Sequence, residues 1–278
     1  MSNNMTDSDK PENTEEQTSD LILTIDNGTQ SVRALLFDLK GNLLAISRIE
    51  LEAYFSKKPG WAEQSADYFW QMLGQCCQQL WQQDEVIENG YRDRVTAVTV
   101  TTQRGTVINL DKHGEALRPA ILWLDQRLCQ QNKAMPWYWR TAFSLIGQSK
   151  VVEYFRRKSQ ANWLEQHEPN VWGNTDKFLL LSGFLTYRLT GQFKDSVGSI
   201  VGYFPFDYKK QNWAKAWDWK WHALPVKRSM LPILVKPGDV LGGISSDAAT
   251  HTGLKVGTKL IASASDKACE VLGSGCIQ

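Results

Sequence analysis

The sequence predicts an α/β domain with a mixed sheet that opens with an antiparallel meander and carries a mostly helical insertion. Three observations support this fold class. Strand-like segments separated by Gly-containing turns occupy residues 21–50, and strand-like and helix-like segments then alternate up to residue 127. After a largely helical stretch over 128–225, short strand-like segments return. Such an alternation is typical of α/β proteins, in which helices cover a sheet.

The predicted elements follow one another along the chain. The first strand, Leu21–Ile25, is apolar on both faces, as a central strand is, whereas the next two strands keep polar positions around a turn at residues 40–42. A helix is predicted from about Ser65, which can cap it, because the residues from Tyr68 to Trp81 supply a rich apolar face. The segment Arg94–Thr102 then alternates as a strand does.

The later elements begin with a hairpin whose turn is at residues 112–114. The segment Leu122–Arg127 is predicted to lead into a helix, and the strongest helix of the insertion to run from Lys177 to Leu189 and to close at Thr190-Gly191. A late strand, KLIASAS, ends just before Asp266 and is expected to rejoin the opening sheet. This succession resembles the ribonuclease-H-like core of the actin, Hsp70 and sugar-kinase superfamily.

The composition excludes several functional classes. Lys and Arg total 31 and Asp and Glu total 30, so the net charge of +1 gives no long-range attraction to nucleic acid or anionic membranes, and a small or weakly charged substrate is expected. The five cysteines show no spacing of a disulfide framework or zinc site. No apolar stretch reaches about 20 residues and no signal peptide is present, which favours a cytoplasmic location. Residues 1–20 are polar and are expected to be a disordered lead-in.

Tryptophan is abundant, and eight of the twelve tryptophans lie between residues 137 and 221. Flat indole rings can pack against the apolar faces of sugars, which would make this stretch a sugar platform. Ordinary packing of buried aromatic residues explains the same pattern and is the favoured interpretation.

The first candidate site is the turn segment DNGTQSVR, which joins the first two predicted strands. A phosphate site needs backbone N–H groups in a tight turn, hydroxyl donors, a cation, and a carboxylate that holds magnesium through water. The segment supplies these groups in Gly28, Thr29, Ser31, Arg33 and Asp26. An ordinary hairpin turn explains the Asn-Gly dipeptide equally well. Neither a Walker loop nor a dinucleotide-binding fingerprint is present.

The second candidate site combines the ends of two predicted strands. Gln103 and Arg104 follow the strand that ends at Thr102, while Trp123 and Asp125 follow the next hairpin. Polar groups beside an indole can bind several hydroxyls and one apolar face of a sugar. Taken singly, a surface arginine and a core indole explain Arg104 and Trp123 as well.

The third candidate site is Asp266, at the end of the late strand. Phosphoryl transfer to an alcohol needs positioning, charge neutralisation and a carboxylate that accepts the hydroxyl proton. The apolar residues that follow also predict a helix, with Asp266 as its N-cap. The two roles are compatible, because ligands of α/β proteins bind at the carboxyl edge of the sheet.

Seven motifs in register make the chain resemble the FGGY family of carbohydrate kinases, which includes glycerol kinase and xylulokinase. The resemblance runs from residue 21 to the last residue, and its motifs are IDNGTQSVRALLFD, GWAEQ, TTQRG, LRPAILWLDQR, LTGQFKDSVGS, TGLKVGT and SASDKA. It implies ATP-dependent phosphorylation of a sugar or polyol, with ATP and Mg²⁺ as cofactors. Asp266 would be the catalytic base, and Asp26 would organise magnesium.

The resemblance also implies which residues surround the ligands. The phosphate loop would consist of Gly28, Thr29, Gln30, Ser31 and Arg33. The sugar site would consist of Gln103, Arg104, Trp123, Asp125 and, beside the base, Lys267.

The sequence departs from the family pattern in three places. Glycerol kinases have a second threonine where Gln30 stands and a glutamate where Gly105 stands, so glycerol is a less expected substrate. Xylulokinases typically carry Met-His-Gly where this chain has QRG. The usual Gly-Asp-Gln or His-Asp-Gln around the base is Ser-Asp-Lys here, so Lys267 places an ammonium where it acts on the base or meets an acidic or phosphorylated substrate.

Family members have two domains of comparable size, and residues 21–278 correspond to the N-terminal, sugar-binding one. No counterpart of the C-terminal ATP-binding domain is expected in this chain, so efficient catalysis by these residues alone is not expected. A non-catalytic sugar-binding or regulatory module is the main alternative. An ATPase or phosphatase of the actin-like superfamily is disfavoured by the sugar-site motifs. Many family members self-associate, so the resemblance allows a homo-oligomer.

Overall fold

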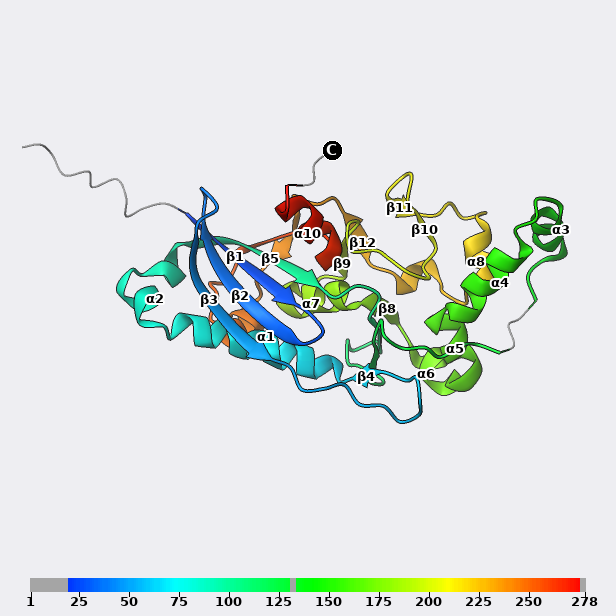
Figure 1. Cartoon of the computed structure of the whole chain (residues 1–278), viewed down its shortest axis with the longest axis horizontal. Coiled ribbons are helices and arrows are strands. Elements are labelled where there is room, and N and C mark those ends of the chain that lie inside the picture. The colour runs from blue at the N-terminus through cyan, green and yellow to red at the C-terminus, as the bar shows by residue number, and fades with distance from the viewer. Residues whose placement is uncertain (1–19, 131–133, 276–278) are drawn as a thin grey trace, which may run out of the picture.

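The fold is centred on a mixed sheet of six strands. A computed structural model describes residues 20–130 and 134–275, so the predicted lead-in lies outside it apart from Asp20. The six strands are Leu21–Asn27 (β1), Ser31–Asp38 (β2), Leu43–Glu50 (β3), Val95–Thr102 (β5), Val240–Gly243 (β13) and Lys259–Ile261 (β14). They lie in the order β13-β14-β5-β1-β2-β3, and Figure 1 shows β3, β2, β1 and β5 side by side. The first three strands are antiparallel, and β1, β5 and β14 are parallel, which confirms the predicted meander and the returning late strand.

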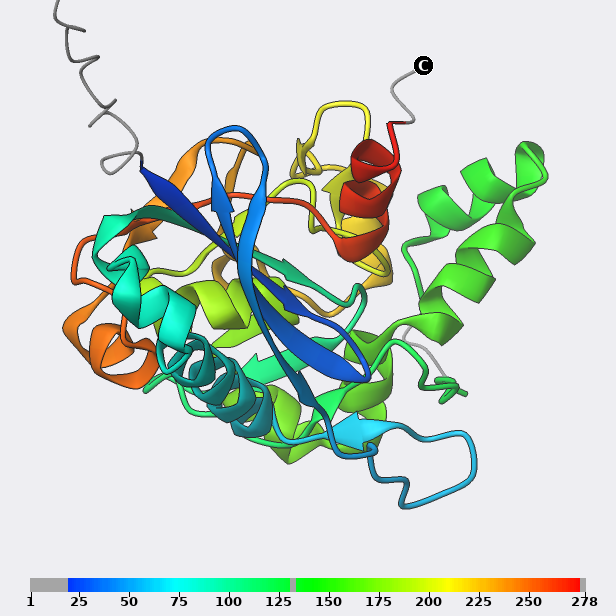
Figure 2. The same cartoon turned by 60° about the vertical axis from the view of Figure 1, so that its left-hand side comes forward.

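Alternating burial explains how β1 becomes the centre of this sheet. Leu21, Leu23 and Ile25 are fully buried, whereas the residues between them are half-buried. The covering helices are α1 (Ala66–Trp81), α7 (Leu181–Thr190) and α9 (Ser246–Thr252). They pack against one another and against the sheet, and Figure 2 shows α1 lying along it. The core therefore sits between β1 and β5 on one side and these helices on the other.

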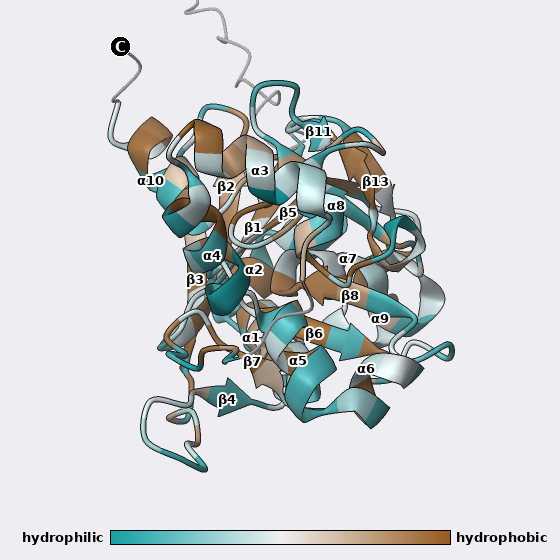
Figure 3. Ribbon diagram, turned by 90° about the vertical axis from the view of Figure 1, so that its right-hand side faces the viewer, coloured by the Kyte–Doolittle hydropathy of each residue, from teal (hydrophilic) through white to brown (hydrophobic). Residues whose placement is uncertain are grey.

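A second, antiparallel sheet carries the insertion. Its strands are Glu63–Gln64 (β4), Val107–Leu110 (β6), Ala120–Ile121 (β7) and Lys177–Leu180 (β8), in the order β4-β7-β6-β8. The predicted hairpin is formed by β6 and β7. The helices around it are α3 (Trp137–Leu145), α4 (Ser149–Lys158), α5 (Gln160–His167), α6 (Pro169–Asn174) and α8 (Trp219–Ala223). Figure 3 shows this side of the molecule, with apolar residues in brown along the inner strands.

The remaining elements connect or flank these two larger sheets, and four of them pair as the two-stranded sheets β10-β11 and β12-β9. They are α2 (Asp84–Glu88), η2 (Tyr91–Arg94), β9 (Lys194–Ser196), β10 (Phe206–Asp207), β11 (Asn212–Trp213), η3 (Arg228–Met230), β12 (Ile233–Val235) and α10 (Asp266–Gly273). Within the described parts of the chain, no helix is long and apolar enough to cross a membrane.

The tryptophan-rich insertion forms a second hydrophobic core. Trp163 and Trp213 are buried in it, beside Phe178 and Phe204, whose rings stack 5.2 Å apart. Of the eight tryptophans between residues 137 and 221, those that are partly buried against this core are Trp139, Trp172, Trp219 and Trp221. Of the eight, only Trp137 and Trp217 are largely exposed. The packing interpretation of these tryptophans is therefore confirmed for most of them.

Two sequence expectations about where helices begin are wrong. The predicted helix from Lys177 begins only at Leu181, because the first four residues pair with β6 as the antiparallel strand β8. The segment Leu122–Arg127 does not lead directly into a helix. Its backbone N–H groups at Leu122 and Gln126 instead donate to Ala62 and Gly60, and the next described helix is α3. In both cases a strand or loop partner distant in sequence overrides local helical preference.

Candidate functional site

The sheet brings two candidate sites together at the carboxyl ends of β1 and β5. These strands are parallel neighbours, and Asp26 lies opposite Thr101 in their register. Just beyond the strand ends, the backbone N–H of Gln103 donates to the carbonyl oxygen of Asn27 at 2.9 Å. Parallel pairing thus places the DNGTQSVR turn beside the TTQRG segment, as expected for ligand sites of α/β proteins.

Thr29 links the predicted phosphate loop to the predicted sugar residues. Its Oγ1 donates to Oε1 of Gln103 at 3.0 Å and accepts from Nε1 of Trp123 at 2.9 Å. Gln103 is buried, whereas the indole of Trp123 is 52% exposed. The Thr29 hydroxyl therefore fixes an exposed aromatic face beside the glutamine, in addition to its predicted place in the phosphate loop.

The rest of the predicted phosphate loop is a tight turn. The backbone N–H of Gly28 donates to the carbonyl oxygen of Ser31 at 3.0 Å, and a Cβ at Gly28 would lie 3.3 Å from that oxygen. Ser31 is buried, Gln30 is exposed, and the Gln30 carbonyl accepts from the N–H of Leu51. The turn therefore presents Gln30 to solvent and leaves little space for a side chain at Gly28.

Asp26 faces several other charges. Its Oδ2 lies 3.6 Å from Nη1 of Arg33. Burial raises the pKa of Asp26, the Arg33 guanidinium opposes that shift, and the carboxylates of Asp266 and Glu270 raise the pKa further. The third candidate site is thus close enough to Asp26 to act on it electrostatically.

Asp266 is the first residue of α10, and Ser265 occupies the N-cap position. The helix packs on the end of β5 through Cys269, whose Sγ lies 3.6 Å from Oγ1 of Thr101. Lys267 donates from Nζ to Oε2 of Glu270 at 2.7 Å, and this bond raises the pKa of Lys267, whereas the nearby Arg104 lowers it. We refer to these groups at the strand ends as the open charge cluster: Asp26, Arg33, Arg104, Asp266, Lys267 and Glu270.

Asp125 lies in a different environment from the other predicted sugar residues. Its side chain is 1% exposed, its Oδ2 accepts from the N–H of Ala62 at 2.7 Å, and both oxygens accept from the guanidinium of Arg127 at 2.7 Å. The structure therefore does not leave this carboxylate free to meet a ligand.

Arg127 joins Asp125 to a larger network. Its Nη2 donates to Oε1 of the fully buried Glu63 at 2.9 Å, and its guanidinium lies 4.0 and 4.5 Å from the ring centroids of Trp61 and Trp163. Arg118 also donates to Glu63. We refer to this network as the buried charge cluster: Glu63, Arg118, Asp125, Arg127 and Glu168.

Sequence reasoning missed the buried charge cluster, although four of its five residues lie in two recognised motifs. GWAEQ contains Trp61 and Glu63, and LRPAILWLDQR contains Arg118, Asp125 and Arg127. The sequence did contain one indication of this cluster, because its charged residues stand among apolar residues and buried charges require partners. The sequence did not indicate that the charged residues of one motif pair with those of the other.

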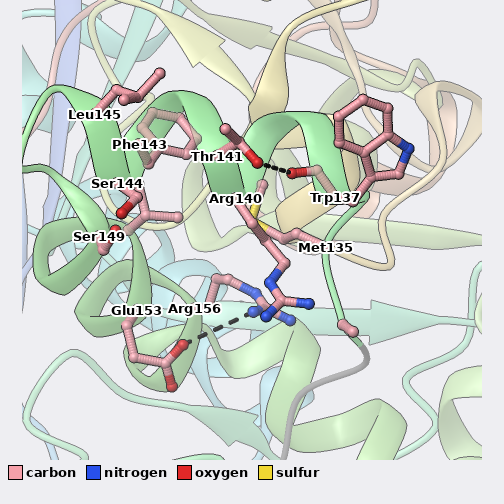
Figure 4. A pocket seen from close by; sticks show the side chains of 12 residues that line it. Met135, Trp137, Arg140, Thr141, Phe143, Ser144, Leu145, Ser149, Glu153 and Arg156 are labelled. Carbon is pink, nitrogen blue, oxygen red and sulfur yellow. Dashed lines mark hydrogen bonds and ion pairs between the residues drawn. The ribbon is translucent and has the colours of Figure 1, made fainter.

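A large cavity of about 900 Å³ lies apart from these sites, between α3 and α4 (Figure 4). It is lined by residues such as Met135, Phe143, Arg140 and Arg156, and none of the predicted site residues lines it. Thr29 and Gln103 instead line a hollow of about 10 Å³ with Gln64 and Tyr68. The larger of these two hollows is therefore not the one that the predicted site residues line.

Comparison with known proteins identifies the family. The N-terminal domain of the FGGY family of carbohydrate kinases matches residues 21–273, so this chain belongs to the FGGY family. It is 26% identical to xylulose kinase of Lactococcus lactis subsp. lactis, over 92% of this chain and 49% of that protein. It is 27% identical to glycerol kinase of Thermococcus onnurineus, over 69% of this chain and 38% of that protein. The chain thus spans about half the length of the curated xylulose kinases that it matches.

Solved structures confirm the predicted fold. Xylulose kinase from Rhodospirillum rubrum superposes with a TM-score of 0.74 at 24% identity, covering 92% of this chain and 52% of that one. Plasmodium falciparum glycerol kinase, solved with ADP, gives a TM-score of 0.69 at 19% identity, covering 92% and 50%. The chain has the actin-like, ribonuclease-H-like fold of these sugar kinases.

Proposed function

We propose that this chain is the sugar-binding and base-bearing part of an ATP-dependent carbohydrate kinase, which phosphorylates a hydroxyl group of a sugar or polyol. The observation that carries the proposal is the convergence, at the carboxyl ends of β1 and β5, of an aspartate on α10 with an exposed indole and a phosphate-type turn. Membership of the FGGY family supports the same reaction class.

In this proposal Gln103, Arg104 and Trp123 hold the sugar. The exposed indole packs against an apolar sugar face, and the exposed guanidinium and the neighbouring amide bind hydroxyls. The resemblance implied that Asp125 binds the sugar, whereas we assign it a structural role. Because its oxygens are occupied by Ala62 and Arg127, it positions the segment that carries Trp123.

Asp266 is the proposed general base. It is half-buried at the start of α10, where it accepts the proton of the attacking hydroxyl once the sugar is held between it and Trp123. Phosphoryl transfer requires little else from the protein than positioning and electrostatic stabilisation. Arg33 supplies a cation at the phosphate side.

The residues present fit a magnesium ion that is shared with phosphate and water. No group of three or more His, Cys, Asp or Glu side chains able to hold a metal occurs among the described residues. Mg²⁺ commonly uses one or two carboxylates together with substrate phosphates, and Asp26 provides such a carboxylate next to the negative charges of Asp266 and Glu270. Mg²⁺–ATP would supply the phosphoryl group and neutralise its charge.

Two measurements test the proposal. Calorimetric titration of this chain with D-xylulose, other ketoses, polyols and Mg²⁺–ATP should detect binding of a sugar or polyol. In the whole protein that contains this chain, Asp266→Asn should lower kcat by about 10²–10⁴-fold and leave sugar affinity unchanged, because only the proton acceptor is removed. Asp84→Asn, on the exposed helix α2, is the matched control and should leave kcat unchanged.

Normal turnover of the Asp266→Asn protein would contradict the assignment of the base. Sugar binding without turnover in the whole protein would instead favour the non-catalytic sugar-binding module.

A further inference from the structure

The segment that leads to Asp266 is held by the end of β9 and the residues that follow it. Gly198 and Ala264 form a parallel bridge, and the carbonyl of Gly198 accepts from the N–H of Ser265 at 3.1 Å. The hydroxyl of Ser196 donates to the carbonyl of Ser263 and accepts from the N–H of Gly198 at 3.2 Å. We refer to Asp195–Ser199 as the β9 buttress. It contacts each of the three residues immediately before the proposed base.

Gly198 is required at its position because of this close approach. A Cβ there would lie 2.9 Å from Cβ of Ala264, 3.1 Å from its Cα and 3.2 Å from the carbonyl oxygen of Ser263. These atoms belong to the backbone or to its first side-chain carbon, so no flexible side-chain end can move aside. Any side chain at Gly198 would therefore displace the segment before Asp266.

Asp195 anchors the buttress in the protein interior. It is 1% exposed, its Oδ1 accepts from the N–H of Ser196 at 2.8 Å, and its Oδ2 accepts from the hydroxyl of Ser182 at 2.8 Å. Ser182 lies in the first turn of α7, directly after β8. The contacts thus run from the second sheet through α7 and β9 to the start of α10.

Among the described residues, no hydrogen bond joins the buttress itself to Gln103, Arg104 or Trp123, although the hydroxyl of Ser263 donates to the carbonyl of Val100 in β5. Gln103 and Arg104 follow β5, and Trp123 follows β7, whereas the buttress contacts the segment between β14 and α10. A general base must lie within about 2.6–3.2 Å of the proton that it accepts. A displacement of the segment from 263 to 265 therefore affects proton transfer before it affects sugar binding.

We propose that Asp195, Ser196 and Gly198 are positioning residues, which set the location of Asp266 for proton transfer to it. The inference rests on the proposed function, because it requires Asp266 to be the base. This inference gives a role to the LTGQFKDSVGS motif. That motif belongs neither to the proposed sugar site nor to the phosphate loop.

The test compares kcat with sugar affinity in the whole protein that contains this chain. Gly198→Ala should lower kcat by about 10²-fold, since a misplacement of about 1 Å has that effect, and should change the Kd for the sugar by less than about twofold. Gly173→Ala is the matched control, because a Cβ at Gly173 meets no atom within 4 Å and should change neither quantity.

Ser196 gives a second variant pair for the case in which Gly198→Ala does not fold. Ser196→Ala removes both hydroxyl contacts and should lower kcat selectively, whereas Ser196→Thr keeps the hydroxyl and should restore most of it. Unchanged kcat in Gly198→Ala and Ser196→Ala, or a parallel loss of kcat and sugar affinity, would overturn the inference. A normal kcat in Asp266→Asn would instead overturn the proposed function, so the two failures are distinguishable.

Discussion

The open and buried charge clusters contain the same kinds of side chain but differ in how deeply those side chains are buried. In the buried cluster, Glu63, Asp125 and Arg127 have side chains that are at most 2% exposed, and each accepts or donates several hydrogen bonds. In the open cluster, Arg33 is 45% exposed and meets Asp26 at only 3.6 Å. The buried charges are paired mainly with one another, although Oε2 of Glu63 and Nη1 of Arg127 have no hydrogen-bond partner among the described residues, whereas the charges proposed to meet a ligand are more exposed to solvent.

The largest expected effect separates the two clusters by stability. Arg127→Ala should reduce the free energy of unfolding by about 3–5 kcal/mol, because the buried carboxylate of Asp125 loses its cation and that of Glu63 keeps Arg118 but loses its second arginine. Arg33→Ala, the matched control, should reduce it by less than about 1 kcal/mol, since its ion pair is exposed. Urea denaturation of the chain measures both values. Equal losses in the two variants would remove the distinction between the clusters.

A second test uses a buried carboxylate that has no cation. Asp195 forms no ion pair in the described part of the chain, and burial raises its pKa to about 7. The native state then holds this proton more tightly than the unfolded chain, so the contribution to stability is complete below about pH 4 and is lost as pH rises towards 7. The slope should reach about 1.4 kcal/mol per pH unit.

Asp195→Asn should remove this slope and keep the fold. The amide can donate to the Ser182 hydroxyl and accept from the Ser196 N–H, as a protonated carboxyl does. Urea denaturation at several pH values between 4 and 7 measures the difference. A variant as pH-dependent as the original chain would show that Asp195 is not the group responsible.

The smallest expected effect concerns the hydroxyl that joins the phosphate loop to the sugar residues. Thr29→Val keeps the side-chain shape but leaves Oε1 of Gln103 and Nε1 of Trp123 without their partner, which should reduce stability by about 1 kcal/mol. Sugar affinity, measured by calorimetry, should fall as Trp123 is released. Thr29→Ser keeps the hydroxyl and should preserve both stability and sugar affinity. If Thr29→Ser lowered them as much as Thr29→Val does, the methyl group of Thr29 and not its hydroxyl would be responsible.

Much of the central sheet could be predicted from the sequence, because burial there follows a local period. The apolar run of β1, the alternating residues of β5 and the turn between the first two strands are read directly from neighbouring residues. The prediction of a helix from Lys177 was wrong because the sequence there has no period that distinguishes a helix from a strand. A run of apolar residues fits a helix or a buried strand equally well, and only the pairing of β8 with β6 decides between them.

In the candidate site, too, the sequence located individual residues but not the contacts between them. Family motifs located Asp26, Gln103, Trp123 and Asp266, but they could not show that Thr29 joins Gln103 to Trp123 or that Arg127 occupies the carboxylate of Asp125.

The sequence by itself determined the fold class, the family and the positions of the residues proposed to meet sugar and phosphate. These properties depend on residue type and order along the chain. The tertiary structure alone decided which charges are buried, which hydroxyl joins the two loops, and that the β9 buttress holds the segment before Asp266. Those contacts join residues tens of positions apart, and their partners are selected by strand pairing and packing, which local sequence patterns do not encode.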